Sequence, residues 1–122
     1  MSCHDLKSAL TIVCKAGYYD IFCFLLEQKS DINHDKLLLS ACYGGNVDMV
    51  EDLINMGANI NYITSKFGSS PLLEACTRGH LPIVTLLIDK AAEINQRAGR
   101  DSPLISACQR GHLPIVTLLI DK

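Results

Sequence analysis

Residues 78–90 read RGHLPIVTLLIDK, and residues 110–122 read the same thirteen letters, 32 positions further along the 122-residue chain. The likeness extends upstream, where Ser70-Pro71-Leu72 aligns with Ser102-Pro103-Leu104. Self-similarity at a period of 20 to 50 residues is typical of proteins that are built as a stack of similar units. The two segments therefore predict a repeat architecture.

Two weaker copies precede this pair. One lies 34 residues earlier and keeps Ala41-Cys42 and Gly45, and the faintest lies 28 residues before that and keeps Cys14 and Gly17. Four copies fill the chain, which is of a length typical of one domain. We expect a single domain over residues 1–122, with repeats at about 2–33, 34–61, 62–95 and 96–122, the last of them truncated.

Each copy carries the pattern of two short helices. In the third copy, Leu72–Cys76 provides an apolar stripe at helical spacing, and Gly79 follows where a left-handed residue commonly ends a helix. The second helix starts at once, at His80 here and at Asn46 in the copy before, with Pro82 in the first turn, where a backbone N–H has no partner in any case. Helix pairs this short cannot bury a core alone, so stacking is required.

The repeated pattern resembles a known family. It reads Ser-Pro-Leu-x-x-Ala-Cys-x-x-Gly-His-x-x-Ile-Val-x-x-Leu-Leu-Ile with a trailing Asn-Ile-Asn or Glu-Ile-Asn, and it is similar to the ankyrin repeat, whose period is about 33 residues. The resemblance implies an all-α ankyrin-repeat solenoid of about four stacked helix-turn-helix repeats with short hairpin-like loops. Leu73 and Ile105 replace the signature histidine, so its usual hydrogen bond should be absent. Only three residues separate Asn33 from Leu37, too few for a projecting loop.

The resemblance also implies a function and a surface for it. Ankyrin arrays contact partners through loop tips and the exposed ends of the first helices, so we expect a non-catalytic protein–protein interaction module that binds a protein or peptide on its concave face. A regulatory ankyrin segment of a larger enzyme or channel is the alternative. The matching positions are Tyr43, Lys66, Phe67, Thr77, Arg78, Arg97, Arg100, Gln109 and Arg110.

Charge is unevenly divided between the two expected faces. Five of the nine partner-binding positions are basic, whereas the convex side takes Asp20, Glu27, Asp48, Glu51, Asp52 and Asp89. Solvated charge scattered for solubility explains much of the same pattern. The hypothesis is a mildly basic concave surface that binds an acidic segment of a partner.

Three asparagines recur where the second helices end. The resemblance implies that such residues can be substrates of an oxygen-dependent asparaginyl hydroxylase, and the matching positions are Asn33, Asn61 and Asn95. A structural role, in which the amide bonds the following turn, is the simpler interpretation.

Four of the six cysteines share one position of the repeat: Cys14, Cys42, Cys76 and Cys108. Small residues there let neighbouring repeats approach, and free cysteine packs as a small hydrophobe. The spacing of Cys76 from His80 and of Cys108 from His112 could hold zinc, so a thiol or metal-binding protein is a further alternative. Packing for the cysteines and a capping role for the histidines is simpler. We expect buried free thiols, no metal and no cofactor.

Composition excludes several other classes. The chain has 11 Lys+Arg against 13 Asp+Glu and no basic block, which disfavours nucleic acid as a partner. There is no G-x-S-x-G, P-loop or G-x-G-x-x-G motif, so we expect no enzyme. Neither an export signal nor an apolar run of roughly 20 residues is present, so we expect no membrane insertion and an intracellular protein, in the cytoplasm with the nucleus still open.

The last copy has no polar terminating repeat after it. Its final segment, Ile115–Ile120, is almost wholly apolar, and the outer faces of terminal repeats are normally polar. We therefore expect part of this face to be open, either because the chain is a fragment of a longer array or because it self-associates through the C-terminal face.

Overall fold

The computed structural model describes residues 3–28, 32–63, 68–90, 92, 94 and 102–121, and side chains from residue 5 onward. Within these residues the chain forms eight α-helices and no strand. They are α1 (Cys3–Ala16), α2 (Tyr19–Leu26), α3 (His34–Gly44), α4 (Val47–Asn55), α5 (Pro71–Arg78), α6 (Leu81–Asp89), α7 (Pro103–Arg110) and α8 (Leu113–Asp121). The helices follow one another as four pairs, so the predicted all-α repeat fold is confirmed.

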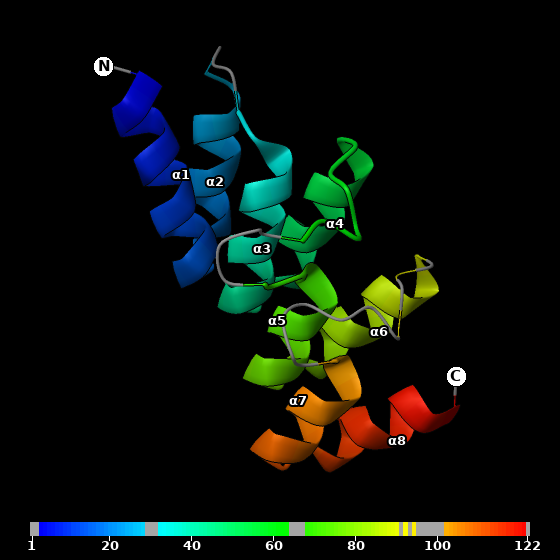
Figure 1. Cartoon of the computed structure of the whole chain (residues 1–122). Coiled ribbons are helices and arrows are strands. Elements are labelled where there is room, and N and C mark those ends of the chain that lie inside the picture. The colour runs from blue at the N-terminus through cyan, green and yellow to red at the C-terminus, as the bar shows by residue number, and fades with distance from the viewer. Residues whose placement is uncertain are drawn as a thin grey trace.

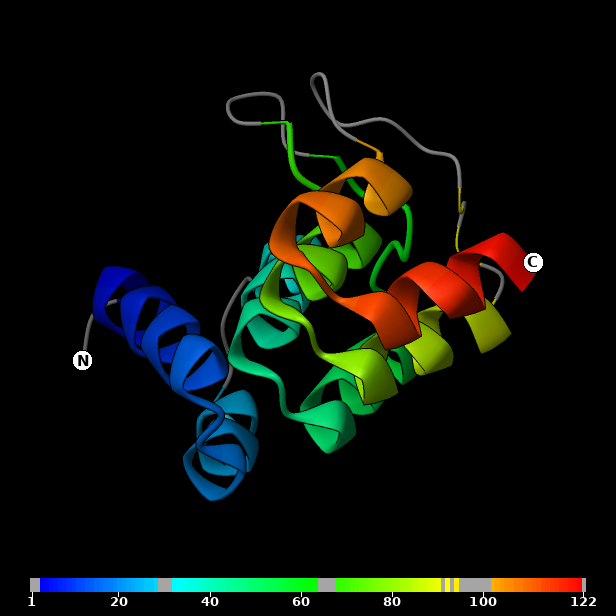
Figure 2. The ribbon, with the colours of Figure 1, turned by 90° about the horizontal axis from the view of Figure 1, so that it is seen from below.

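The four helix pairs stack in chain order from the N-terminus to the C-terminus (Figure 1). Seen from below, the first helices α1, α3, α5 and α7 form one row, and the second helices α2, α4, α6 and α8 form another (Figure 2). First helices pack more closely on one another than second helices do. The stack therefore curves, with the first helices on its concave side.

Local sequence signals set the ends of the helices. The first helices α3, α5 and α7 end at glycines with positive φ, and helices α3, α4, α5 and α7 begin after residues whose side chains accept a hydrogen bond from the backbone N–H three positions on. These capping residues are Asn33, Asn46, Ser70 and Ser102. Such caps satisfy backbone groups that the helix leaves unpaired, so the predicted helix boundaries are confirmed.

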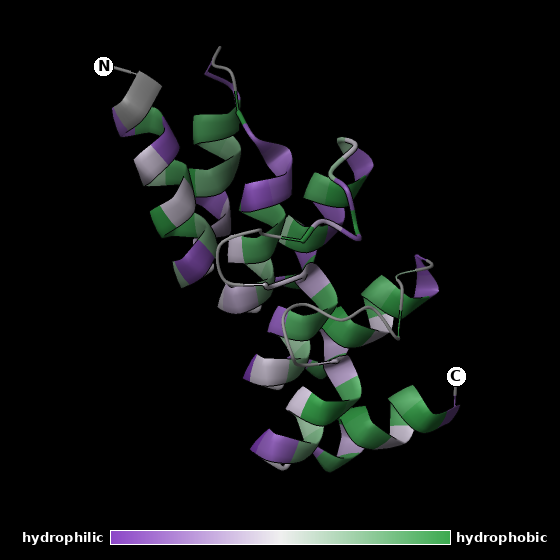
Figure 3. Ribbon diagram, in the orientation of Figure 1, coloured by the Kyte–Doolittle hydropathy of each residue, from purple (hydrophilic) through white to green (hydrophobic). Residues whose placement is uncertain are grey.

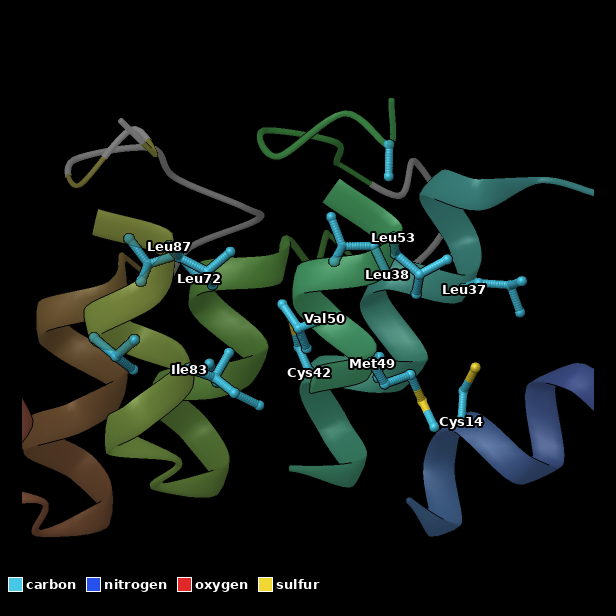
Figure 4. Packing of buried hydrophobic residues seen from close by; sticks show 14 of the residues in the cluster. Cys14, Leu37, Leu38, Cys42, Met49, Val50, Leu53, Leu72, Ile83 and Leu87 are labelled. Carbon is cyan, nitrogen blue, oxygen red and sulfur yellow. The ribbon is translucent and has the colours of Figure 1, made fainter. Parts of the chain in front are cut away.

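The core runs along the stack between the two rows. Equivalent residues of successive copies fill it, such as Leu38 and Leu72 from the first helices and Val50 from a second helix, all of them buried (Figure 4). Helices α6 and α8 consist largely of hydrophobic residues, whereas the C-terminal ends of α5 and α7 are hydrophilic (Figure 3). Each repeat thus buries its apolar face against the next.

Two details of the predicted departures from the family pattern can be checked. Residues 34–36 form the first turn of α3, so no loop projects between Asn33 and Leu37, as predicted. Leu73 is buried and Ile105 half-buried, which shows that the positions of the signature histidine serve packing. Among the described residues, no helix has both the length and the apolar character needed to span a bilayer.

Candidate partner-binding surface

The C-terminal ends of the first helices bring five predicted residues into one row. Tyr43 lies at the end of α3, Thr77 and Arg78 at the end of α5, and Gln109 and Arg110 at the end of α7. All are exposed except Thr77, which is half-buried. The other four predicted positions, Lys66, Phe67, Arg97 and Arg100, lie outside the described residues. We call Lys15, Tyr43, Thr77, Arg78, Gln109 and Arg110 the first-helix row.

Tyr43 stands between two cations from neighbouring repeats. The guanidinium carbon of Arg78 lies 3.9 Å from the centroid of the Tyr43 ring, and Nζ of Lys15 lies 5.7 Å from it. Both distances fall within the range in which a cation is attracted to an aromatic face. Tyr43 is 38% exposed, so it presents an apolar surface framed by positive charge.

One cation of the row also has an acidic neighbour. Nε of Arg78 lies 3.4 Å from Oε1 of Glu74, one helical turn earlier, and Oε2 of Glu74 accepts a hydrogen bond of 2.9 Å from the Ser69 hydroxyl. An exposed pair of this kind contributes little to stability. Arg78 thus contacts both Glu74 of its own helix and the Tyr43 ring of the preceding repeat.

The Thr77 hydroxyl joins α5 to α7. It donates to the carbonyl oxygen of Leu73 over 2.8 Å, and it lies 2.6 Å from the hydroxyl of Ser106. Since its one proton goes to Leu73, Ser106 is the donor in the second bond. The Thr77 hydroxyl thus already makes two hydrogen bonds within the protein in the absence of a partner.

His80, which follows the repeat glycine Gly79, does not cap its second helix, contrary to the prediction. The side chain of His80 makes no cap hydrogen bond at the start of α6. Its Nε2 instead lies 2.9 Å from the carbonyl oxygen of Tyr43, and Nε2 of His112 lies 3.4 Å from that of Thr77. A carbonyl only accepts, so each ring donates to the preceding repeat.

These histidines hold the backbone of the first-helix row, a role that sequence reasoning missed. Asn46, their counterpart in the second copy, donates from Nδ2 to the carbonyl oxygen of Gly17 over 3.2 Å and also caps α4. The signal was a polar side chain recurring directly after the repeat glycine. A cap and an inter-repeat bond both explain that recurrence, and only the packing distinguishes them.

The shared cysteine position is interior in three copies of four. Cys14, Cys42 and Cys76 are buried, and this burial raises the pKa of Cys14 and Cys76 to about 12 and that of Cys42 as well. Cys108 is exposed, so the prediction is wrong for it. In the part of the chain that the structure describes, no helix packs on the outer side of α7. Within that part no three His, Cys, Asp or Glu side chains gather as a metal site either.

A groove opens between α1 and α3. It encloses about 510 Å³ and is lined by Lys7 and Lys36 over the apolar side chains of Leu10 and Leu37. Both lysines are exposed and both leucines are buried. The groove therefore offers positive charge above an apolar floor, which sequence reasoning did not foresee.

The acidic residues of the convex side are exposed with one exception. Asp20, Asp48 and Glu51 face solvent, as do Glu27 and Asp89. Asp52 is half-buried and accepts a hydrogen bond from the Tyr19 hydroxyl of the preceding repeat, so its predicted role as a solvated charge is wrong.

Two of the three repeated asparagines lie within the described residues. Oδ1 of Asn33 accepts a hydrogen bond of 3.2 Å from the backbone N–H of Lys36 and caps α3, so its amide does bond the following turn. The backbone N–H of Asn61 donates to Oδ1 of Asn59 over 3.0 Å. Asn95 lies outside the described residues. Hydroxylation of these asparagines stays a prediction.

Comparison with known proteins agrees with this architecture. Residues 37–122 match the family model described as ankyrin repeats (3 copies). The chain is 35% identical over 65 residues to human ankyrin repeat and KH domain-containing protein 1 and 40% identical over 65 residues to the Drosophila melanogaster protein mask, in each case over 53% of this chain and 2% of the relative. It is 36% identical over 97 residues, 77% of this chain and 4% of the relative, to Caenorhabditis elegans mask-1. The chain thus spans a few per cent of the length of these relatives, and it belongs to the ankyrin-repeat family.

Proposed function

We propose that the chain is a non-catalytic module that binds an acidic protein segment along the first-helix row. Ankyrin repeats are generally protein–protein interaction modules, and the row supplies this one with a recognition surface. The observation that carries the proposal is the Tyr43 ring, held between Lys15 and Arg78 and still exposed. Aromatic and arginine side chains are the commonest anchors at protein interfaces.

The charges along the concave side support an acidic partner. Lys15, Arg78 and Arg110 belong to the row, and within the part of the chain that the structure describes the ion pair in the row is that of Arg78 with Glu74. Lys7 and Lys36 add two cations at the groove between α1 and α3, above its apolar floor. A segment that carries carboxylates beside apolar side chains matches both regions, and its attraction should weaken as salt screens the charges.

Peptide selection tests this proposal because it requires no named partner. A random peptide library displayed on phage, selected on the folded chain, should yield peptides enriched in Asp and Glu beside apolar residues. Their affinity should fall at least about tenfold on Tyr43→Ala or Arg110→Glu. The matched control is Glu51→Arg on the convex side, which should leave binding intact. Peptides without acidic residues, or binding lost on Glu51→Arg, would overturn the proposal.

Two further expectations concern the context of the module. Its place as a regulatory segment of a larger enzyme or channel stays a prediction, and the relatives above are many times longer than the matched part. We also propose an intracellular setting, because the three interior cysteines are free thiols that the fold keeps apart from solvent.

A further inference from the structure

The groove between α1 and α3 combines an apolar floor with a cationic rim. Leu10 and Leu37 are buried at the floor, whereas Lys7 and Lys36 are exposed. The volume of about 510 Å³ is within the range of ligand pockets. Both walls are helices of the described chain, so the groove belongs to a junction between two repeats and not to an end of the stack.

Two features distinguish this junction from the next one along the stack. Thr11 lines the groove, and at its repeat position the three later copies carry leucine or isoleucine. Lys7 is the counterpart of Asp35, whose Oδ1 accepts a hydrogen bond of 2.6 Å from the backbone N–H of Asn59 in the loop before α5. An ammonium group accepts no hydrogen bond, so Lys7 cannot hold a loop in this way. The smaller side chain and the cation both favour an open junction.

Three polar side chains at the groove can donate hydrogen bonds to a ligand. Lys7 and Lys36 form no ion pair within the described residues. Asn33 also lines the groove, and because its Oδ1 accepts from the backbone N–H of Lys36, its side-chain NH₂ group is left as a donor. Two ammonium groups and one amide above an apolar floor match a carboxylate that lies beside a large apolar side chain.

The groove lies in line with the Tyr43 ring along the same two helices. Lys36 and Tyr43 are seven residues apart on α3, and Lys7 and Lys15 are eight residues apart on α1. Such separations correspond to about 10 to 12 Å along a helix. Since Lys7 and Lys36 line one groove and Nζ of Lys15 lies 5.7 Å from the centroid of the Tyr43 ring, both pairs lie at the junction of α1 with α3.

We propose that the groove is an anchor site for the acidic partner segment, an inference that rests on the proposed function. An apolar side chain of the segment enters the groove, and a carboxylate next to it binds Lys7 and Lys36. A second carboxylate of the same segment reaches Lys15 beside Tyr43. Because an extended peptide advances about 3.3 Å per residue, the two carboxylates are three or four residues apart.

The sequences of selected peptides give the first test. Peptides selected from the phage library on the folded chain should share an apolar residue next to an acidic one, with a second acidic residue three or four positions away. The strongest of them is then synthesised with one residue inserted or deleted between the two carboxylates. Fluorescence anisotropy should show an affinity lower by about fivefold for each change of spacing, since one exposed charge pair is lost. Replacing the apolar residue by serine should cost at least about tenfold.

Variants of the chain test where the apolar residue and its carboxylate bind. Lys7→Gln combined with Lys36→Gln removes both cations of the groove and should weaken binding by about tenfold. The matched control is Lys90→Gln, at the exposed lysine that follows α6, which should leave affinity unchanged.

A filled groove gives an independent measurement. Thr11→Trp places a large side chain in the groove, at a position where Leu73 of the third copy is buried, and it should weaken binding by at least about tenfold. Thr85→Trp is its matched control. The hydroxyls of Thr11 and Thr85 each donate to the carbonyl oxygen four residues earlier, but Thr85 lies on α6, outside the groove. It should bind as the wild type does.

A double-mutant cycle assigns each carboxylate to its cation. Asp→Asn or Glu→Gln at the peptide's first acidic position should lower affinity for the wild type and have little further effect on the variant that lacks Lys7 and Lys36. The same change at the second acidic position should couple to Lys15→Gln instead.

The outcomes separate this inference from the proposed function. Peptide binding that requires Tyr43 and Arg110 but is unaffected by the groove variants would overturn the anchor site and leave the proposed function intact. Equal affinities at every spacing, or an equal loss on Lys90→Gln, would also overturn it. If the selection yields no acidic peptide, the proposed function itself is wrong, and the anchor site is wrong with it.

Discussion

Arg78 and Tyr43 belong to neighbouring repeats, and the guanidinium carbon of one lies 3.9 Å from the ring centroid of the other. The contact joins α5 to α3 on the surface proposed for partner binding. A residue that served a partner alone could be removed without effect on folding. Arg78 holds its neighbour as well, so its two roles must be separated by experiment.

The contact between these residues should be measurable as a coupling energy. Arg78→Ala removes the cation from the ring and should lower the free energy of unfolding by about 0.5 to 1 kcal/mol. In a double-mutant cycle with Tyr43→Leu, measured by urea denaturation, most of that loss should vanish because the ring is already gone. Strictly additive effects would contradict the contact. Arg78→Lys, which keeps the charge and loses the planar group, should have a free energy of unfolding between that of the wild type and that of Arg78→Ala.

Two glycines in identical sequence should respond differently to the same substitution. Gly79 and Gly111 have φ of 77° and 74°, so alanine is strained at both, by about 1 to 2 kcal/mol. At Gly79 the added carbon would also lie 2.6 Å from Cε1 of His112, whereas at Gly111 nothing lies within 4 Å. Gly79→Ala should therefore destabilise the chain by about 1 kcal/mol more than Gly111→Ala, since the ring must leave the Thr77 carbonyl. Equal losses in urea denaturation would mean that the histidine contact contributes nothing.

The cysteines should divide into two classes of reactivity. At neutral pH a bulky thiol reagent should label Cys108 fast, and Cys14, Cys42 and Cys76 slowly, because burial both hinders access and keeps the thiol protonated. Peptide mapping by mass spectrometry identifies the labelled sites. Under denaturing, non-reducing conditions all six cysteines should react. Fewer than six free thiols would count against an intracellular protein.

Stability should fall in alkaline solution. Burial raises the pKa of Cys14 and Cys76 from 9.0 to about 12, so the folded chain holds these protons more tightly than the unfolded chain does. The stabilisation is complete below pH 9.0 and is lost as the pH rises toward 12. Cys76→Ala should make the decline of unfolding free energy with pH shallower. The matched comparison is Cys108→Ala, which removes an exposed thiol at the same repeat position.

Asn33 should be important for stability whether or not it is modified. Its side chain caps α3, so Asn33→Ala should lower the free energy of unfolding by about 1 kcal/mol, as measured by urea denaturation. Asn33→Asp keeps an acceptor at the cap and should cost less. For modification, protein purified from a host that contains an asparaginyl hydroxylase should show a species heavier by one oxygen atom. Its absence would remove the hydroxylation hypothesis.

Features that depend on a few adjacent residues can be predicted from the sequence. Features that depend on contacts with a neighbouring repeat cannot. Helix α5 begins after Ser70 and ends before Gly79, through a hydrogen bond and a dihedral angle that are set within a few residues. Its ends could therefore be predicted from the local sequence. Cys76 and Cys108 have the same local sequence pattern, yet one is buried and the other exposed, because within the described residues a further repeat packs only on that of Cys76.

The same distinction applies to the candidate surface. Tyr43 and Arg78 could be assigned to the exposed helix ends by alignment of the repeats. The hydrogen bond of His80 to the carbonyl of Tyr43 could not be predicted in this way. Whether His80 makes this bond or caps its own helix depends on the distance between two repeats. The groove between α1 and α3 likewise arises from packing between two helices.

Helices α6 and α8 are the same nine residues in two different surroundings. Their intrinsic helix propensities and the chemistry of their amides are therefore equal, and a flanking repeat lies beyond α6 but not, in the described part of the chain, beyond α8. In a linear array, stability is the sum of what each unit has alone and what it gains from its neighbours. The difference in hydrogen-exchange protection between Val84 and Val116 then measures nearest-neighbour coupling alone. A single unmutated molecule thus provides both the helix with a following repeat, α6, and the reference helix, α8, within the described residues.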